Sequence, residues 1–516
     1  TIPLMIFMKP KNSHSMNKAG YISVLFLLLL GLTASGQRYE RVVRDNFWNS
    51  SSNITGIRQD SISRSYAEAY GSYEKGGFRD TWQAVKGWSA GAVTASIRHL
   101  EKISLKGSFA FDQTEGYGMC GSMFIDPGFY PVDILEFTPG RKTLQTYSFD
   151  GGVSYDISED WRIGASMDFE SANMSKRKDL RHSNWKLDMT IAPGVMYHRG
   201  DLALGASYIF RKTAESIKAE QVGTAESSYY AFLDKGLMYG VYSVWSGSGL
   251  HLSEAGVNIF PVKDFSNGAA LQMQYKGLFA EVEYLRTQGT VGEKEYIWFR
   301  FPGNEVNAIA GYRIRGRHHT HYARLGIGWK SLMMDESILE KVTENGVTNV
   351  FNHGSNRILA NESISVSPEY EAAGRILEIR AGAVLKWKES LSSQMYPYAD
   401  YQSLMNWKAY ADALLHIGQF DLGAMLSFRG GSVDESQDKV SEESGVQTAP
   451  FRLQEWYDRQ MEYHTATAID ASLSLRYNFR KGIYIQAEGW WDHGFGLRYM
   501  TGADRFGTAL RIGYNF

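Results

Sequence analysis

The sequence predicts an all-β protein: a single closed antiparallel transmembrane β-barrel of about 18 strands, within a range of about 14 to 18. Three observations lead to this prediction. Apolar and polar residues alternate along many short segments, the turns between the segments alternate short and long, and the polar face carries full charges. A soluble core does not tolerate unpaired charges, whereas a membrane barrel turns its apolar face to lipid and its polar face to the lumen.

The last segment of the chain has the clearest alternation. Leu510, Ile512, Tyr514 and Phe516 form one apolar register, and the residues between them are small or polar. Because successive side chains of a strand point to opposite faces, this segment is predicted to be a strand with one apolar face. It resembles the terminal strand by which the barrel assembly machinery recognises outer-membrane barrels, so we expect these four residues to act as an assembly signal.

The composition agrees with a large antiparallel sheet. Among 516 residues, Gly (52) and Tyr (31) are frequent and Pro (11) is scarce, which suits strands better than helices. The mean hydropathy of −0.32 is too low for a protein that spans a membrane with several helices. Lys and Arg (54) nearly balance Asp and Glu (56), so the basic excess of a nucleic-acid-binding protein is absent.

The N-terminus has the pattern of a secretory signal peptide. A short positive region at Met16–Lys18 precedes an apolar run, Tyr21–Leu32, and the small residues Ala34–Gly36 follow it. We therefore expect translation to start at Met16 and cleavage to occur before Gln37, so that residues 1–36 are upstream sequence and signal peptide. A transmembrane helix is the alternative, but it needs about 20 apolar residues.

Residues 37–64 have no strong periodicity, and we expect them to form a lead-in segment that lies in the periplasm or enters the lumen. The barrel is predicted to occupy residues 65–516, with a first strand at Tyr66–Tyr73. No stretch resembling a linker divides this region, which argues against the alternative of several β-sandwich domains.

Hairpins follow one another through the rest of the chain, each with one apolar and one polar face. Two long segments, Thr114–Thr143 and Lys212–Asn267, are expected to lie outside the wall. We expect further strands at Ser89–Leu100, Ile103–Asp112, Tyr147–Ile157, Trp161–Glu170, Trp185–Tyr197, Leu202–Phe210, Leu271–Tyr275, Leu278–Leu285, Leu377–Lys388 and Ile469–Phe479, with later turns near Gly316, Gly374, Gly418 and Lys481.

The turn lengths predict an orientation in the membrane. Outer-membrane barrels have short periplasmic turns and long extracellular loops, and this chain alternates in the same way. Aromatic residues near the expected strand ends are typical of the girdles at the two membrane interfaces. They are Tyr155, Trp161, Tyr197, Trp329, Trp387 and Trp407.

Charged residues on the polar faces are expected to line the lumen. They are Asp150, Arg162, Asp168, Glu281, Glu283, Arg324, Arg380, Arg476 and Glu488. Such charges set ion selectivity or pair across the interior. The carboxylates could also catalyse a reaction, but the sequence has no Gly-x-Ser-x-Gly motif and no set of Ser, His and Asp that spacing brings together, so we expect no enzyme and assign no catalytic residue.

No cofactor or metal site is expected. The cluster His318-His319-Thr320-His321 has metal-ligating side chains, but it falls in a predicted periplasmic turn without accompanying carboxylates or Cys. The single cysteine, Cys120, is expected in a loop, where it has no partner for an internal disulfide.

The long segment Lys212–Asn267 is rich in aromatic residues, which argues against disorder. We expect it to form a lid over the outer mouth, with Tyr229, Phe232, Tyr242 and Trp245 packed against the barrel. The alternative is a surface that binds a ligand or a partner. The apolar stretch Phe124–Gly140 is expected to fold into the mouth as well.

Several motifs together resemble an uncharacterised family of outer-membrane β-barrels. They are Phe47-Trp48, Asn53-Ile54-Thr55-Gly56, Asp126-Pro127, Tyr130-Pro131 and Pro139-Gly140, together with the Tyr-rich hairpins. The resemblance extends over nearly the whole mature chain. It implies a barrel in the outer membrane of a Gram-negative bacterium, in a family often encoded beside TonB-dependent receptors, and it supplies no catalytic residues.

These features together favour a channel or transport component for an unknown solute, with a lumen partly occluded by loops. A non-conducting barrel that binds a receptor or another envelope protein is the alternative, and a barrel-embedded hydrolase is the third reading. The expected partners are outer-membrane lipid and lipopolysaccharide, the assembly machinery, and a TonB-dependent receptor or a lipoprotein.

Overall fold

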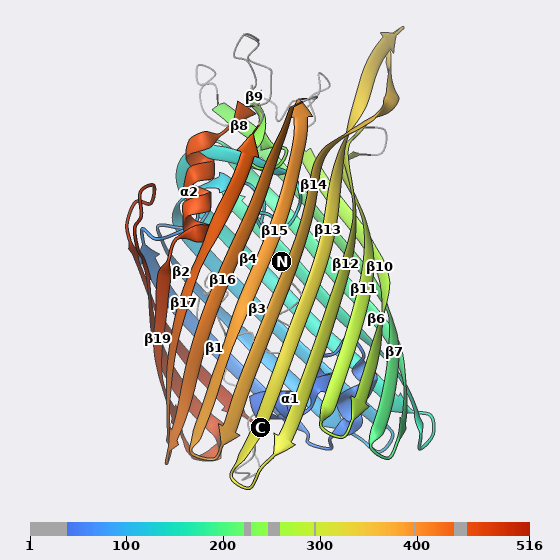
Figure 1. Cartoon of the computed structure of the whole chain (residues 1–516), viewed down its shortest axis with the longest axis vertical. Helices are drawn as coiled ribbons and strands as arrows, with labels where there is room; N and C mark the ends of the chain where they lie inside the picture. The colour runs from blue at the N-terminus through green and yellow to red at the C-terminus, as the bar shows by residue number, and fades with distance from the viewer. Residues whose placement is uncertain (1–38, 221–228, 246–258, 294–295, 396–397, 438–450) are drawn as a thin grey trace.

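The structure, a computed structural model, describes residues 39–220, 229–245, 259–293, 296–395, 398–437 and 451–516. Within these residues the chain is almost entirely strand, and the helices are short (Figure 1). None of the helices described is both long enough and apolar enough to cross a membrane. Residues 1–36, the expected upstream sequence and signal peptide, lie outside the described residues.

The helices are α1 (Tyr39–Asp45), η2 (Phe47–Ser50), η3 (Ile54–Gln59), α2 (Gln454–Thr465) and η4 (Arg480–Gly482). The strands are β1 (Arg64–Gly76), β2 (Lys86–His99), β3 (Ile103–Ser122), β4 (Asp133–Asp156), β5 (Trp161–Lys176), β6 (Arg181–Arg199), β7 (Leu202–Glu220), β8 (Tyr229–Asp234), β9 (Tyr239–Trp245), β10 (Ile259–Tyr275), β11 (Leu278–Glu293), β12 (Tyr296–Arg315), β13 (His319–Glu344), β14 (Val347–Gly374), β15 (Leu377–Met395), β16 (Tyr398–Ile417), β17 (Phe420–Gln437), β18 (Phe451–Arg452), β19 (Ala468–Asn478), β20 (Ile483–Gly494) and β21 (Asp504–Asn515).

Eighteen of these strands form the wall of a closed antiparallel barrel, which confirms the predicted fold class. Each wall strand pairs with the next one along the chain, and the last strand, β21, pairs with β1 to close the ring. The backbone of Phe516 completes this seam by exchanging hydrogen bonds of 2.8 and 2.9 Å with Ser65. Strands β8, β9 and β18 are not part of the wall and form a small sheet that extends from β4.

The predicted alternation of short and long connections holds only in part: one end has only short turns, whereas the other has long connections, such as β7 to β10, together with two-residue ones, such as β13 to β14. At one end, the lower end in Figure 1, tight turns join the strands, for example Lys276-Gly277 between β10 and β11 and Gly418-Gln419 between β16 and β17. Gly418 has a φ of 61°, which favours glycine in such a turn. We call this end the short-turn end. The opposite end carries the longer connections.

The two long segments that were expected to lie outside the wall were predicted with the wrong borders. The segment Thr114–Thr143 is largely strand, because β3 continues to Ser122 and β4 begins at Asp133. The segment Lys212–Asn267 likewise contributes its first residues to β7 and its last to β10. In both regions the inner face of the wall becomes apolar, so the two-residue alternation that marks the other strands is lost.

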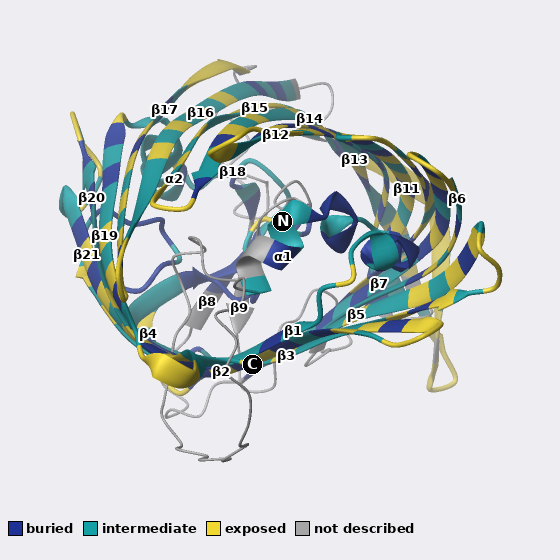
Figure 2. Ribbon diagram, turned by 90° about the horizontal axis from the view of Figure 1, so that it is seen from below, coloured by how far each residue is buried: buried dark blue, intermediate teal, exposed yellow. Residues whose placement is uncertain are grey.

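The outer surface of the barrel is apolar. Large side chains stand exposed on one face of the wall strands, for example Leu473 (70%), Leu271 (66%) and Leu510 (60%). Figure 2 shows the barrel along its axis, with exposed residues distributed around the wall. A soluble protein would bury a continuous apolar belt of this kind, so the belt indicates contact with lipid.

The aromatic girdles lie at two levels of the wall. The residues of the first level stand at the short-turn end. Those of the second level stand ten residues further along their strands, counted from the strand end at the short-turn end (319 to 329 in β13, 377 to 387 in β15 and 417 to 407 in β16). At about 3.3 Å per residue and a tilt of about 40°, ten residues rise about 25 Å, the height of an outer-membrane apolar band. The first level holds Tyr155, Trp161 and Tyr197, and the second holds Trp329, Trp387 and Trp407. The second group was expected near strand ends, but these strands continue beyond the membrane.

Candidate functional site: the occluded lumen

Residues 39–63, which contain α1, η2 and η3, fill part of the lumen at the short-turn end (Figure 2). We call them the N-terminal plug. Arg44 of α1 donates to Glu371 of β14 at 2.6 Å and to Glu378 of β15 at 2.8 Å. Burial disfavours the charge of Arg44, but Glu371 and Glu378 outweigh burial and hold the pKa of its guanidinium above the ordinary value. On another side of the lumen, Arg58 forms an ion pair of 2.8 Å with Asp156.

Asn53 holds the centre of the plug against three wall strands. Its side chain is fully buried. The amide nitrogen lies 3.0 Å from the carbonyl oxygen of Val195 in β6, 3.2 Å from that of Ala206 in β7, and 3.0 Å from Oε1 of Gln272 in β10. The amide oxygen accepts from the backbone N–H of Thr55 at 3.2 Å. A single side chain therefore joins the plug to three neighbouring strands.

Trp48 and its neighbours pack the plug onto the wall. The Trp48 ring is 1% exposed and meets Phe279 of β11 edge-on, with the ring centres 5.3 Å apart. Phe47 makes a similar contact with Tyr322 of β13 at 6.4 Å. Burial of such aromatic side chains adds apolar stabilisation to the polar contacts of Asn53.

The inner wall provides space for the plug by presenting glycine. A Cβ added at Gly194 would lie 2.4 Å from Asn53, and one at Gly164 would lie 2.7 Å from Ile54. Both distances are too short for real side chains. The wall and the plug therefore fit each other closely, and a residue with a side chain at either position would displace the plug.

Other parts of the chain lie at the opposite end. The small sheet of β8 and β9 lies inside the ring (Figure 2), and residues of the connection 123–132 between β3 and β4 are buried beside it. Their apolar side chains form a buried cluster with inward residues of the wall. Its members are Met123, Phe124, Tyr130, Val132, Ile134, Leu180, Ile217, Ala219, Ala231, Leu233, Phe260, Val262, Val291, Trp298, Phe299, Phe301, Met334, Ile358 and Leu359. We call this group the upper filling.

Helix α2 extends the upper filling on the side of β16 and β17. Trp456 of the helix meets Phe137 edge-on, with ring centres 5.4 Å apart. Tyr457 is 3% exposed and packs beside Phe232 of β8. Glu462 accepts hydrogen bonds from the backbone N–H groups of residues 498–500 at 2.5–2.7 Å. The helix is thus fixed both to the small sheet and to the β20–β21 connection.

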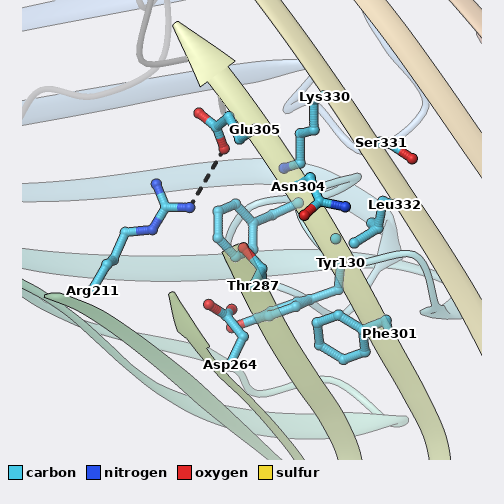
Figure 3. A pocket seen from close by; sticks show the side chains of 12 residues that line it. Tyr130, Arg211, Asp264, Thr287, Phe301, Asn304, Glu305, Lys330, Ser331 and Leu332 are labelled. Atoms are coloured by element: carbon cyan, nitrogen blue, oxygen red, sulfur yellow. Dashed lines mark ion pairs between the residues drawn. The ribbon is translucent and has the colours of Figure 1, made fainter. Parts of the chain in front are cut away.

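A small pocket, partly open to solvent, lies against the upper filling (Figure 3). Asp264, which lines the pocket, stands 11 residues from the short-turn end of β10 (275 to 264). The plug forms hydrogen bonds with the same strand at Gln272 and Gln274, close to that end. The pocket therefore lies above the N-terminal plug. Its lining consists of Phe129, Tyr130, Arg211, Asp264, Thr287, Phe301, Gly303, Asn304, Glu305, Lys330, Ser331 and Leu332.

The nine charged residues expected to line the lumen lie at wall positions that alternate with the apolar outer residues. Arg324 donates to Glu369 at 2.8 Å and to Glu371 at 3.0 Å, and Glu371 also binds Arg44 of the plug. Glu281 accepts from the backbone N–H of Ser52 at 3.3 Å. Arg324 and Glu281 are therefore part of the contact between the wall and the plug.

The other seven are distributed around the wall. Arg162 pairs with Asp156 at 3.0 Å, Arg380 with Asp412 at 2.7 Å, Asp150 with Lys106 at 3.5 Å and Glu488 with Arg511 at 3.4 Å. Arg476 stacks over Tyr484 at 3.5 Å, Glu283 accepts from Asn307 at 3.4 Å, and Asp168 lies opposite Asp150 on the neighbouring strand. The structure does not gather these seven into one site.

The expected lid residues belong to the small sheet. Phe232 of β8 is fully buried beneath α2. Tyr229 lies in β8, and Tyr242 and Trp245 lie in β9, but their side chains are outside the described residues. Of residues 124–140, Phe124 of the connection and Ile134 of β4 are buried in the upper filling.

Two smaller expectations concern His and Cys. Cys120 lies in β3 rather than in a loop. In the His cluster, Nδ1 of His321 is 2.8 Å from the hydroxyl of Tyr370. The described part of the chain contains no group of three or more His, Cys, Asp or Glu side chains arranged to hold a metal ion.

The contacts of the N-terminal plug with the wall and the pocket were not predicted. The plug consists of one helix of seven residues and two 3-10 helices of four and six, which are too short to produce a periodic signal. Glycines at inward positions, such as Gly164 and Gly194, are the sequence feature that could have indicated close contact with the wall.

A closed ring of 18 antiparallel strands, an apolar outer belt and a charged inner face define a transmembrane β-barrel of the outer-membrane type. The chain belongs to the family of unknown function DUF6850, whose model matches residues 55–516. This confirms the expectation of an uncharacterised outer-membrane barrel family. No curated protein matches the sequence.

Several solved barrels are similar to the chain at low sequence identity. A mutant of the ferric enterobactin receptor PfeA from Pseudomonas aeruginosa is 10% identical, with a TM-score of 0.38, over 89% of this chain and 81% of that one. The siderophore receptor PirA from Acinetobacter baumannii is 10% identical, with a TM-score of 0.41, over 89% of this chain and 81% of that one. The outer membrane protein opdK from Pseudomonas aeruginosa is 9% identical, with a TM-score of 0.34, over 88% of this chain and 99% of that one. Similarity at this level establishes no shared ligand or activity.

Proposed function

We propose that this protein is a transport component of the outer membrane of a Gram-negative bacterium, whose lumen is closed at rest by its own chain. The observation that supports this proposal is the N-terminal plug, which binds wall strands around the lumen. A barrel of 16 to 18 strands otherwise leaves an aqueous channel. A solute would pass only when the plug or the upper filling moves.

The nature of the plug contacts favours a device that can open. Most of them are hydrogen bonds and ion pairs, for example those of Arg44 and Asn53. Water can replace such bonds at modest net cost, since an intramolecular hydrogen bond contributes only about 0.5–1.5 kcal/mol. We expect a TonB-dependent receptor or a lipoprotein to be the partner that releases the plug, since the sequence resembles a family often encoded beside such receptors.

The test is solute flux into liposomes that contain the folded protein. We expect the unmodified protein to pass a small neutral sugar slowly, and a variant that lacks residues 39–61 and 229–249 to pass it fast. A deletion of residues 340–351 in the β13–β14 hairpin is the control, because in the described strands these residues pair with each other. Its flux should match that of the unmodified protein.

The alternative function is a non-conducting barrel that binds other envelope proteins. The close fit of the plug to Gly164 and Gly194 favours this reading, since a permanently filled lumen needs no moving part. Absence of flux in the doubly deleted but folded barrel would favour the scaffold and contradict transport.

A further inference from the structure

The pocket beside the upper filling contains two opposite charges, Asp264 and Lys330, that form no close ion pair. Asp264 is only 3% exposed, yet its carboxylate forms no hydrogen bond or ion pair with any residue that the structure describes. Lys330 lines the same pocket, and its ammonium likewise lacks a carboxylate or hydrogen-bond partner in the described ranges. Its recorded neighbour is the ring of Phe129, whose centre is 5.9 Å from Nζ.

Two further polar groups of the pocket are incompletely satisfied. The Arg211 guanidinium is 3.5 Å from Glu305, while its Nε atom is buried without a partner. Tyr130 is 5% exposed, and its hydroxyl is buried without a hydrogen bond among the described residues. Figure 3 shows Tyr130, Arg211, Asp264 and Lys330 converging from different elements on one space.

Many charges on the inner face of the wall have a close partner, as Arg324 has in Glu369 at 2.8 Å. Burying a charge without a partner is much more costly than burying a close pair. A buried polar group without a hydrogen bond calls for an explanation, and a missing ligand is one that accounts for all four groups together.

The chemistry of the pocket specifies the class of ligand. Asp264 and Glu305 balance Arg211 and Lys330, so the pocket is neutral overall and a ligand with a net charge would unbalance it. The unpartnered groups nevertheless include both signs. A ligand that satisfies both carries one positive and one negative group. Phe129, Tyr130 and Phe301 add an apolar surface.

We infer that this pocket binds a small zwitterion with an apolar body, such as a free amino acid or a short peptide. The ammonium of the ligand donates to Asp264. Its carboxylate accepts from Lys330 and Arg211 and from the hydroxyl of Tyr130. The inference deepens the proposed function, on which it rests for its physiological meaning, by naming the class of solute.

The test is calorimetric binding to the folded full-length protein in detergent, with phenylalanine as the probe. We expect phenylalanine to bind about tenfold or more tightly than N-acetylphenylalanine, which lacks the ammonium, and phenylalanine amide, which lacks the carboxylate. Maltose, a neutral polyol, should not compete. Equal binding of the blocked analogues, or tighter binding of maltose, would overturn the inference.

Two variants assign the contacts. Asp264→Asn should weaken the binding of phenylalanine about tenfold. It should leave the binding of N-acetylphenylalanine unchanged, because that analogue has no ammonium group to interact with Asp264. Lys330→Gln should weaken the binding of phenylalanine and leave the binding of phenylalanine amide unchanged. Asp434→Asn, at an exposed position of β17, is the control and should alter neither.

Binding is measured without any transport, so the inference and the proposed function fail separately. If phenylalanine binds as described but never crosses the membrane, the pocket assignment stands and the transport proposal falls. If the folded protein does not bind phenylalanine at millimolar concentration, the zwitterion site is wrong whatever the barrel conducts.

Discussion

Gly56 lies so close to Trp48 that no side chain fits between them. A Cβ at position 56 would be 2.1 Å from the Trp48 ring, which is itself held against Phe279 of the wall. One turn of η3 further back, Asn53 bonds to three strands. At the scale of single residues, the position of the plug thus depends on one residue without a side chain and one amide.

The first prediction concerns this contact. Gly56→Ala should release the plug, because the added methyl group has no space unless Trp48 leaves its site. Loss of well-packed contacts of this kind costs about 1–3 kcal/mol, so amide hydrogen exchange of residues 47–59 should accelerate by about five- to 150-fold.

Gly71→Ala is the matched control, because a Cβ at Gly71 would have its nearest neighbour at an ordinary 3.9 Å. The alanine at position 71 should leave exchange in the plug unchanged. Unchanged exchange in Gly56→Ala would show that the plug does not pack on Trp48 as described.

At the scale of elements, each wall strand separates lipid from lumen by its two faces. In β19, Leu473 is 70% exposed on the outer face, and the neighbouring Ser472 lies on the inner face. Leu473→Arg should lower the free energy of unfolding in lipid by about 2–4 kcal/mol, since arginine is disfavoured in the apolar band.

Ser472→Arg should cost far less, because it points into a lumen that contains Asp470 on the same face. Denaturant titration of the refolded barrel in bilayers compares the two variants. Equal losses at both positions would reverse the assignment of the inner and outer faces.

The closing strand β21 gives the third prediction. Phe516 ends the apolar register of Leu510, Ile512 and Tyr514, and its ring stacks on Tyr514 with centres 5.4 Å apart. If this register is the assembly signal, deletion of Phe516 should reduce the heat-modifiable protein in the outer membrane, measured by gel shift. Replacing Phe516 with Tyr should preserve it. Normal amounts after deletion would contradict the signal but not the barrel.

The wall was predictable because its faces differ so strongly. Strands such as β15, with Leu377, Ile379 and Leu385 alternating with Glu378 and Arg380, follow the two-residue period over a long stretch. The alternation is lost where the inner face also becomes apolar. In β12, for example, Phe299 and Phe301 point into the upper filling, so the same strand no longer alternates.

The contents of the lumen were less predictable for a physical reason. The positions of Asn53, Tyr130 and Asp264 depend on contacts between residues far apart in the sequence, which no local pattern records. Phe124–Gly140 was recognised as a segment that enters the mouth because it is apolar, but its role in forming a pocket with Asp264 and Lys330 follows only from the closed ring.

At the scale of the whole molecule, the barrel is filled at two levels. The N-terminal plug occupies the short-turn end, the upper filling occupies the opposite end, and the pocket lies above the plug against the upper filling. The pocket lies near the second aromatic level, since Asp264 stands 11 residues from the short-turn end, whereas Phe260 and Met334 of the upper filling stand 15 residues from it, beyond that level. A solute bound in the pocket would thus be held inside the barrel between two closures.

The single-channel conductance of the unmodified protein in planar bilayers tests the central claim most directly. If the chain fills its own lumen, we expect closed or rare and small openings. The barrel without residues 39–61 and 229–249 should instead show the steady, large conductance of an open barrel of this size. Steady porin-like conductance of the unmodified protein, or no increase in the doubly deleted and folded barrel, would contradict the account.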